Sequence, residues 1–360
     1  MSKSLEIGLV GLPNVGKSSL FNALTKNDIL VANYPFATIE PNTGIVSVPD
    51  ERLIRLQEFY KSEKIIPATV EFFDIAGLVE GASSGEGLGN KFLSHIRQTN
   101  LIVHVVRVFK DQNIVHVMNN IMPKNDIDVI NTELVLADLE SIDRQLPKLE
   151  KELKSDSKLK DYYEYVKRCK SFLEDNKPLW TMDEVDNIFN EKLSLLTTKP
   201  IIYLFNLDEE DLSNENLKLE LNNLVKPAAT IFISAKLEDS LKNLERNEQL
   251  ELLALYDQKE SGLNKLIKLA YEYLSLQSFL TAGEKEVRAW TVKKGTTAPK
   301  AAGEIHGDFE RGFIAAEIIS YQDLIAYDSY FEAKKAGKVR LEGKNYIMQN
   351  DDIVDFKFNV

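Results

Sequence analysis

Cysteine is almost absent from this sequence: Cys169 is the single cysteine among 360 residues. A lone cysteine excludes an internal disulfide and fits a reducing compartment, so we expect a cytoplasmic protein. Apolar runs as long as the roughly 20 residues of a transmembrane helix are also absent. Met1-Ser2-Lys3-Ser4 leads directly into an apolar stretch, which leaves no room for a signal peptide. A membrane is therefore not among the expected partners.

An excess of basic residues is lacking as well, since the formal net charge is −12. Such a charge argues against wholesale electrostatic capture of nucleic acid. DNA is therefore not an expected partner, whereas a local RNA-binding face stays open. The hydrophobic content of 44% is ample for buried cores. The length exceeds that of one ordinary domain, so we expect about two or three units.

The stretch from Gly11 to Ser18 fits the spacing G-x-x-x-x-G-K-[ST] of a phosphate-binding P-loop. A predicted strand precedes it and a predicted helix follows it, which favours a P-loop over a glycine-containing turn with a chance lysine. Glycine lets consecutive N–H groups face one anion, and the helix N-terminus adds its positive end. Lys17 would reach the β- and γ-phosphates as a catalytic residue, and Ser18 would hold Mg²⁺. The expected nucleotide-binding residues of this loop are Asn14, Val15, Gly16, Lys17, Ser18 and Ser19.

Short apolar segments alternate with helical patterns along much of the chain. We expect strands at residues 5–10, 45–48, 68–74, 101–109, 200–206 and 229–235. This alternation predicts a mostly parallel sheet that helices cover on both faces. From residue 277 onward the pattern changes to a smaller mixed α/β unit, with a hairpin turn expected at residues 343–346.

A heptad pattern interrupts this alternation between about residues 128 and 199. Apolar residues recur in steps of four and three on either side of Ser155-Asp156-Ser157. The first arm carries Val135, Leu139, Ile142, Leu146, Leu149 and Leu153, and the second carries Leu159, Tyr162, Val166, Cys169 and Leu173. The pattern predicts an antiparallel coiled-coil hairpin. Because Cys169 falls on the apolar seam, we expect a core residue and not a reactive thiol.

Three residues outside the P-loop fit the switch of a nucleoside triphosphatase. Asp74 ends a predicted strand, as a carboxylate of the Mg²⁺ site must. Gly77 would offer its N–H to the γ-phosphate, and Thr38 would reach the metal from a loop, so loss of that phosphate would release both loops. The alternatives are a turn-capping aspartate for Asp74 and a solvated hydroxyl for Thr38.

Together these motifs resemble the YchF family of Obg-related P-loop proteins. The resemblance rests on residues 11–18, on Asn33-Tyr34-Pro35-Phe36-Ala37-Thr38-Ile39-Glu40-Pro41-Asn42, and on Asp74-Ile75-Ala76-Gly77-Leu78. It covers the whole chain and implies an α/β fold. The implied parts are a discontinuous P-loop G domain (residues 1–127 and 200–276), an inserted antiparallel α-helical coiled-coil hairpin (128–199) and a ubiquitin-like, β-grasp TGS domain (277–360).

The expected base-recognition motif differs from that of GTPases. GTPases place Asn-Lys-x-Asp after a strand, whereas this chain has Asn206-Leu207-Asp208-Glu209, without the lysine and with a longer carboxylate. The missing lysine and the misplaced carboxylate indicate that the site is not built for guanine. The resemblance implies ATP, with Asn206 and the Leu207 backbone at the adenine edge, Phe109 on its face, and Ser234-Ala235-Lys236 as the other base-contacting loop. The alternative for Asn206 is a strand-end cap.

Water activation lacks its usual glutamine, because Leu78 follows Asp-x-x-Gly. His95 is the catalytic candidate, since it follows a glycine-rich loop and imidazole suits water positioning. The alternative is a surface or packing histidine, whereas His104 lies in an apolar strand and is expected in the core. By resemblance, Asn14 would help to hold K⁺, which implies stimulation of hydrolysis by potassium.

The motifs and the resemblance together imply an ATP-hydrolysing switch that converts ATP to ADP and phosphate. The resemblance also implies docking on the ribosome or RNA that depends on the bound nucleotide, with the TGS domain as the part that meets RNA or ribosomes in relatives. The resemblance suggests a role in translation or stress regulation. In the TGS domain, Lys293, Lys294, Lys300 and Arg311 are candidates for phosphate contacts. One alternative is a GTP-dependent translation or assembly factor, with GTP bound as well as ATP. Another is a nucleotide-gated binding module in which hydrolysis is incidental.

Overall fold

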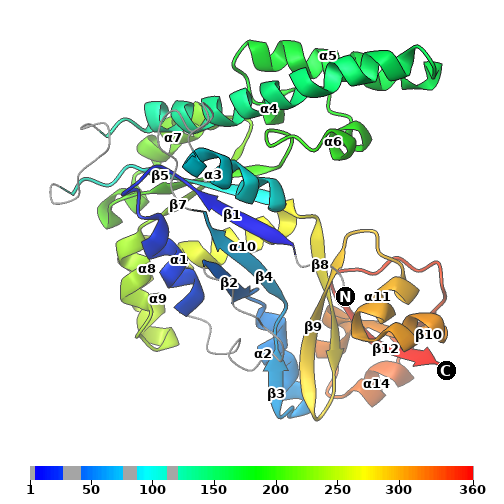
Figure 1. Cartoon of the computed structure of the whole chain (residues 1–360). Helices are drawn as coiled ribbons and strands as arrows, with labels where there is room; N and C mark the ends of the chain where they lie inside the picture. Colours follow the sequence, from blue (N-terminus) through cyan, green and yellow to red (C-terminus); the bar gives the residue numbers. More distant parts are fainter. Residues whose placement is uncertain (1–4, 27–41, 76–86, 112–120, 360) are drawn as a thin grey trace.

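The structure is a computed structural model that describes residues 5–26, 42–75, 87–111 and 121–359. Figure 1 shows its three parts: a body of sheet and helices, a long helical arm, and a second sheet near the C-terminus. Over these residues, no helix combines the length and the apolar character that a bilayer span requires.

The first sheet has six strands in the order β2-β4-β1-β5-β6-β7. All neighbours pair in parallel except β2 and β4, which confirms the predicted mostly parallel sheet. In spatial order the strands are β2 Thr43–Ser47, β4 Thr69–Asp74, β1 Glu6–Val10, β5 Leu101–Arg107, β6 Ile201–Asn206 and β7 Ala229–Ile233. Every residue of β5 and β6 is buried, as expected of central strands covered on both faces.

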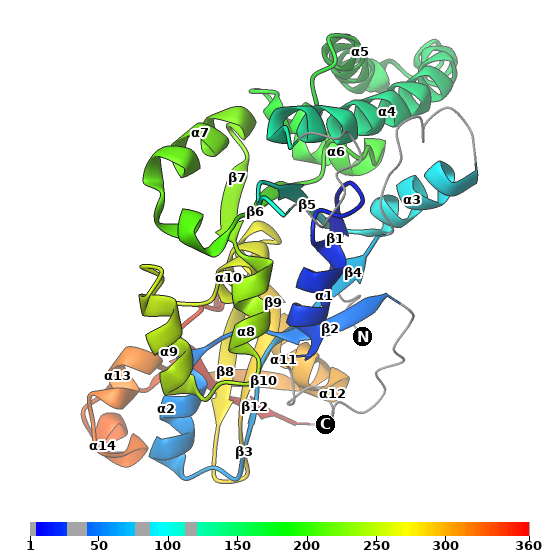
Figure 2. The ribbon, with the colours of Figure 1, turned by 90° about the vertical axis from the view of Figure 1, so that its left-hand side faces the viewer.

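Helices lie on both sides of this sheet. Figures 1 and 2 show α3 and α4 on one side and α1 and α10 on the other. The helices of this body are α1 Lys17–Lys26, α2 Glu51–Tyr60, α3 Gly87–Gln98, α7 Glu215–Val225, α8 Ala235–Leu241, α9 Arg246–Ala254 and α10 Gly262–Tyr273. Because both faces are covered, the open edge at the carboxyl ends of the strands is where a ligand site is expected.

The helical arm is the predicted hairpin. It consists of α4 (Pro123–Leu153) and α5 (Lys160–Glu174), followed by the short α6 (Asn187–Leu193). The two long helices share a separate hydrophobic core that follows the predicted heptad seam. Its buried members include Val135, Ile142, Leu149, Tyr162, Val166, Cys169 and Leu173. Cys169 is fully buried, which confirms it as a core residue, and burial raises the pKa of its thiol.

Helix α4 belongs to two cores. Near its start, Ile127, Ile130 and Leu134 pack in the core of the first sheet, whereas Ile142 and Leu149 pack against α5. The expected domain boundary at residue 128 therefore falls inside a continuous helix. One continuous helix thus carries the arm away from the body.

The second sheet has the order β11-β10-β12-β8-β9-β3. Its strands are β11 Arg340–Glu342, β10 Phe313–Ser320, β12 Asp352–Phe358, β8 Leu276–Ala282, β9 Glu286–Lys293 and β3 Lys64–Ile66. Four short helices accompany it: α11 Ala298–Ile305, α12 Gly307–Arg311, α13 Tyr321–Ile325 and α14 Tyr330–Lys335.

One expectation about this sheet is wrong. Residues 343–346 form a turn but not a hairpin, because β11 and β12 both pair with β10 and not with each other. The segment after the turn instead forms an isolated bridge between Ile347 and Thr297. Turn chemistry indicated the bend, but the strand partners are decided by the rest of the sheet.

Strand β3 joins the two sheets, and sequence analysis did not predict it. It comes from the connection between β2 and β4, yet it pairs in parallel with β9. The joint is reinforced by the Ser62 hydroxyl, which donates to the Gly283 carbonyl at 2.6 Å, and by an ion pair of 3.1 Å between Lys64 and Glu286. The connection that bridges β2 and β4 is therefore also the edge of the C-terminal sheet.

The separate core of the arm generates a prediction about local stability. Leu173 is fully buried there, so Leu173→Ala should cost about 2–5 kcal/mol through lost burial and a cavity. We expect amide hydrogen exchange to accelerate in α4 and α5 but not in β5 and β6.

The matched control is Leu136→Ala, because Leu136 lies on α4 with 44% of its surface exposed. It should change exchange little. Equal acceleration in β5, β6 and the arm of the Leu173→Ala protein would contradict independent cores.

Candidate functional site

A cavity of about 990 Å³ lies at the carboxyl ends of the central strands. It brings together the P-loop, the segment after β5, the segment after β6 and the segment after β7, although these are far apart in the sequence. Among the residues expected to bind nucleotide, those that line it are Asn14, Gly16, Lys17, Ser18, Ser19, Phe109, Asn206, Leu207, Ser234 and Ala235.

The P-loop has the backbone that an anion cradle requires. Asn14 and Gly16 both have positive φ angles, of 63° and 92°. A Cβ atom on Gly16 would lie 2.3 Å from Nδ2 of Asn206, so no larger residue fits without rearrangement. Helix α1 begins at Lys17 and directs its N-terminal end toward this loop. Backbone N–H groups and the helix dipole therefore favour a bound anion here.

Lys17 and Ser18 line the cavity, and both contact Asp74 at the end of β4. The Lys17 ammonium forms an ion pair with Oδ1 of Asp74, and the Ser18 hydroxyl donates to Oδ2 at 3.2 Å. A hydroxyl and a carboxylate are the hard oxygen ligands that Mg²⁺ prefers, so these residues fit the expected metal. The other predicted groups of this switch, Thr38 and Gly77, lie outside the described residues.

Asn206 braces the site from within. Its Nδ2 donates to the Val15 carbonyl at 3.0 Å, and its Oδ1 accepts from the Ala235 N–H at 2.9 Å. The side chain is only 2% exposed. Next to it, the Leu207 N–H donates to the Ile233 carbonyl at 2.7 Å. The two observed bonds of Asn206 join the P-loop to the segment after β7. The contact with the adenine edge that sequence analysis expected of Asn206 stays a prediction.

The segment after β5 is held by charged groups that sequence analysis did not single out. The Arg107 guanidinium lies 4.4 Å from the centroid of the Phe109 ring and donates to the Asp111 carbonyl at 3.1 Å. Asp208 accepts the Lys110 N–H at 3.0 Å. Arg107 is 1% exposed, and a charged residue at the end of an otherwise apolar strand was the available signal. These contacts fix Phe109 at the cavity.

The histidines divide as follows. His95 is exposed near the end of α3 and is not among the residues that line the cavity. Its catalytic role therefore stays a prediction. His104 is 1% exposed, which confirms it as a core residue, and burial lowers its pKa to about 3. It is thus a neutral packing residue near pH 7.

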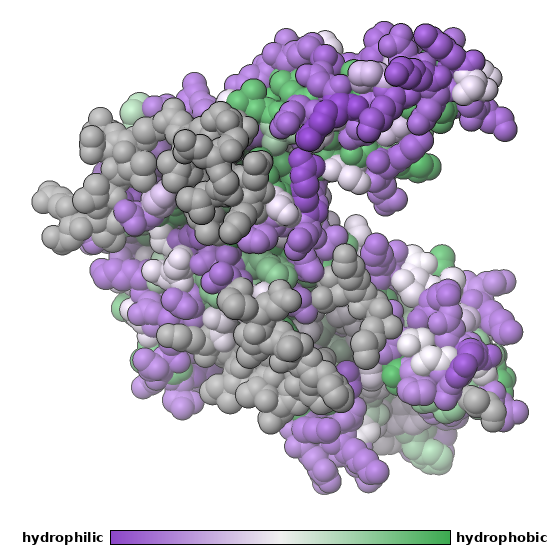
Figure 3. Space-filling view, viewed as in Figure 1, coloured by the Kyte–Doolittle hydropathy of each residue, from purple (hydrophilic) through white to green (hydrophobic). Residues whose placement is uncertain are grey.

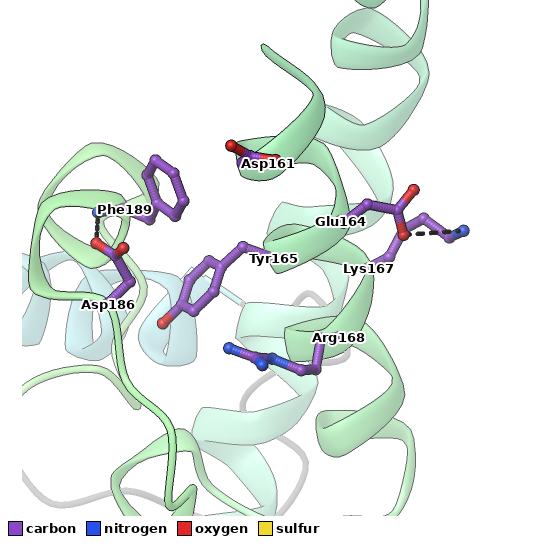
Figure 4. A pocket seen from close by; sticks show the side chains of 7 residues that line it. All are labelled: Asp161, Glu164, Tyr165, Lys167, Arg168, Asp186 and Phe189. Atoms are coloured by element: carbon purple, nitrogen blue, oxygen red, sulfur yellow. Dashed lines mark hydrogen bonds and ion pairs between the residues drawn. The ribbon is translucent and has the colours of Figure 1, made fainter. Parts of the chain in front are cut away.

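A second hollow, of about 580 Å³, lies between α5 and the segment around α6 (Figure 4). Its polar groups already serve the local fold. Tyr165 donates to Asn190 at 2.6 Å, Asp186 accepts the Phe189 N–H at 3.0 Å, and Arg168 pairs with Glu184 outside the hollow at 2.8 Å. We therefore regard this hollow as a structural seam of the arm.

Comparison with known proteins adds the family. Residues 6–137 match a family model described as a 50S ribosome-binding GTPase, and residues 276–359 match the model of the C-terminal part of YchF GTPases, described as a protein of unknown function. The Ribosome-binding ATPase YchF of Bacillus subtilis is 48% identical, over 99% of this chain and 100% of that protein. The chain belongs to the YchF family. The Escherichia coli O157:H7 YchF protein is 46% identical, over 98% of this chain and 99% of its own.

Solved structures agree with this YchF assignment. The Schizosaccharomyces pombe YchF GTPase has a TM-score of 0.87 at 38% identity and covers 99% of this chain and 98% of its own. A GTP-binding protein from Pyrococcus horikoshii, at 19% identity and a TM-score of 0.58, shares the fold. The predicted family and fold class are therefore confirmed: a P-loop G domain, a helical insert and a β-rich C-terminal domain.

The Asn206 brace generates the second prediction. Asn206→Ala leaves the Val15 carbonyl and the Ala235 N–H without their buried partner. We expect the free energy of unfolding, measured by urea denaturation without nucleotide, to fall by about 1–3 kcal/mol.

Asn216→Ala is the control, because Asn216 is exposed on α7. Its effect should stay within about 0.5 kcal/mol. If the two alanine variants have the same free energy of unfolding, the hydrogen bonds of Asn206 do not stabilise this site.

Proposed function

We propose that this YchF-family chain is an ATPase switch that hydrolyses ATP to ADP and phosphate and binds the ribosome according to its nucleotide state. One observation carries the proposal: a single cavity joins an anion cradle to a base-recognition segment that departs from the GTPase pattern. Its location is then the cytoplasm, where ribosomes are found.

The phosphates would lie in the P-loop. Binding of a triphosphate would draw the Lys17 ammonium away from Asp74 and onto the β- and γ-phosphate oxygens. Ser18 and Asp74 would then hold Mg²⁺, which neutralises phosphate charge when it is bound. We propose that Thr38 and Gly77 follow the γ-phosphate, so that its loss changes the surface offered to a partner.

The base would lie between Phe109 and the segments after β6 and β7. Leu207 stands where GTPases carry the lysine that covers guanine, and Glu209 stands where they carry aspartate. These differences favour adenine over the GTP-dependent alternative. The relatives named ATPases agree with this preference, whereas the fission yeast structure is named a GTPase.

Hydrolysis should be slow. Leu78 cannot orient water, and among the described residues that line the cavity there is no arginine to act on the leaving phosphate. We propose that His95 positions the attacking water and that K⁺ held near Asn14 supplies the missing positive charge.

Ribosome binding is proposed from the names of the bacterial relatives and from the shape of the chain. Figure 3 shows the arm and the C-terminal domain standing apart, with an open notch between them. Among the expected phosphate contacts, Lys300 is ion-paired with Glu310 and Arg311 with Asp308. Within the described residues, Lys293 and Lys294 have no such ion pair and are the better candidates for RNA.

Removal of the P-loop lysine tests the proposed activity. Lys17→Met should lower the rate of ATP hydrolysis by about 10²–10³-fold, because the transferred phosphate loses its main positive partner. Phosphate release is the measurement, and EDTA should abolish the wild-type rate.

Lys218→Met is the control, since Lys218 lies on α7 and pairs with Glu215. It should hydrolyse ATP like the wild type. Undiminished hydrolysis by Lys17→Met would show that another site or a contaminant performs the reaction.

Ribosome pelleting without nucleotide, with ADP and with a non-hydrolysable ATP analogue tests the partner. We expect binding to differ between the ADP and analogue conditions. The double variant Lys293→Glu/Lys294→Glu should bind at least about tenfold more weakly and with a shallower salt dependence, because unpaired lysines contact phosphates.

Lys300→Glu/Arg311→Glu is the matched comparison, and its effect should be smaller because both cations already have carboxylate partners. If the amount that pellets with ribosomes changes neither with the nucleotide nor with the charge reversal at Lys293 and Lys294, this mode of binding is excluded.

A further inference from the structure

An ion pair spans the two segments that would contact the base. Lys236 Nζ lies 2.8 Å from Oε1 of Glu209, and both residues line the cavity. The Glu209 side chain is 18% exposed and the Lys236 side chain is 81% exposed. Glu209 follows β6 and Lys236 follows β7, so the pair forms only when these segments are side by side.

Other charges near the pair are also engaged. Asp208, beside Glu209, accepts the Lys110 N–H. Lys242 and Asp239, further along the cavity wall, pair with each other. Glu209 is thus held by a partner from outside its own segment, and that partner is a mostly exposed lysine.

The chemistry of the two purines gives this pair a consequence. Guanine presents N–H donors at N1 and N2, which a free carboxylate accepts through strong charge-assisted bonds. Adenine presents a lone pair at N1, which a carboxylate repels. When an ammonium group neutralises the carboxylate, both effects are lost. The affinity for guanine then falls, and the repulsion of adenine N1 is relieved.

We infer that Lys236 is a specificity-determining residue. It holds the Glu209 carboxylate and so prevents that carboxylate from strengthening the binding of guanine. This inference rests on the proposed nucleotide function and assigns its base preference to an ion pair in addition to the length of the acidic side chain. A longer side chain alone would still present a negative charge to the base.

The test is the ratio of the dissociation constants for GTP and ATP. Both are measured on the full chain by competition against a fluorescent N-methylanthraniloyl ATP analogue. Lys236→Met keeps the aliphatic stem and removes the charge, and it should lower the GTP-to-ATP ratio of dissociation constants by about tenfold, which corresponds to one strong polar contact. Since Lys236 is mostly exposed, the variant should fold, and its circular dichroism spectrum checks this.

Two further variants separate the mechanism from a general charge effect. Lys236→Met/Glu209→Gln should return the ratio to near the wild-type value, because the freed carboxylate is gone. Lys242→Met removes another cavity lysine from an ion pair and should leave the ratio unchanged.

The outcomes distinguish this inference from the proposed function. An unchanged ratio in a folded Lys236→Met protein overturns the inference and leaves the proposed ATP binding intact. A shift in the ratio that persists in the Lys236→Met/Glu209→Gln protein has the same meaning. Failure of the wild-type chain to bind either nucleotide overturns the proposed function, and the inference with it. A shift toward GTP that Glu209→Gln cancels supports both.

Discussion

The site depends on two hydrogen bonds made by one buried amide. Asn206 donates to the Val15 carbonyl and accepts from the Ala235 N–H, and so joins the P-loop to the segment after β7. Gly16 makes room for this side chain, since a Cβ atom there would collide with Nδ2. Buried polar groups are costly when unpaired, so this arrangement is stable only when all three segments are present. The P-loop and the segments after β6 and β7 therefore form one unit.

A second constraint links that unit to the rest of the molecule. Asp74 ends β4 and holds both Lys17 and Ser18, and β4 pairs with β2 in the first sheet. The connection between these strands supplies β3 to the C-terminal sheet. A change around Asp74 thus has a short covalent path to the domain that carries the proposed ribosome contacts. The arm, by contrast, is attached through α4 and keeps its own core.

Much of the fold and of the candidate site could be predicted, because these features depend on local sequence patterns. The P-loop spacing, the apolar strands and the heptad seam of α4 and α5 all appear where sequence analysis expected them. The roles of His95, Thr38 and Gly77 stay predictions. What sequence analysis missed shares one property: β3 and the Glu209–Lys236 pair each depend on contacts with distant residues. A strand as short as β3 also has too few residues to show an alternating period.

The sequence alone determined the phosphate cradle, the alternation of strands and helices along the chain and the core of the arm, because glycine geometry and hydrophobic periodicity act over a few residues. Only the tertiary structure decided what Asn206 bonds to, where the C-terminal sheet takes its edge strand, and which lysine meets Glu209. Those outcomes depend on which segment ends meet in space, and this follows from burying the two sheets and their helices together.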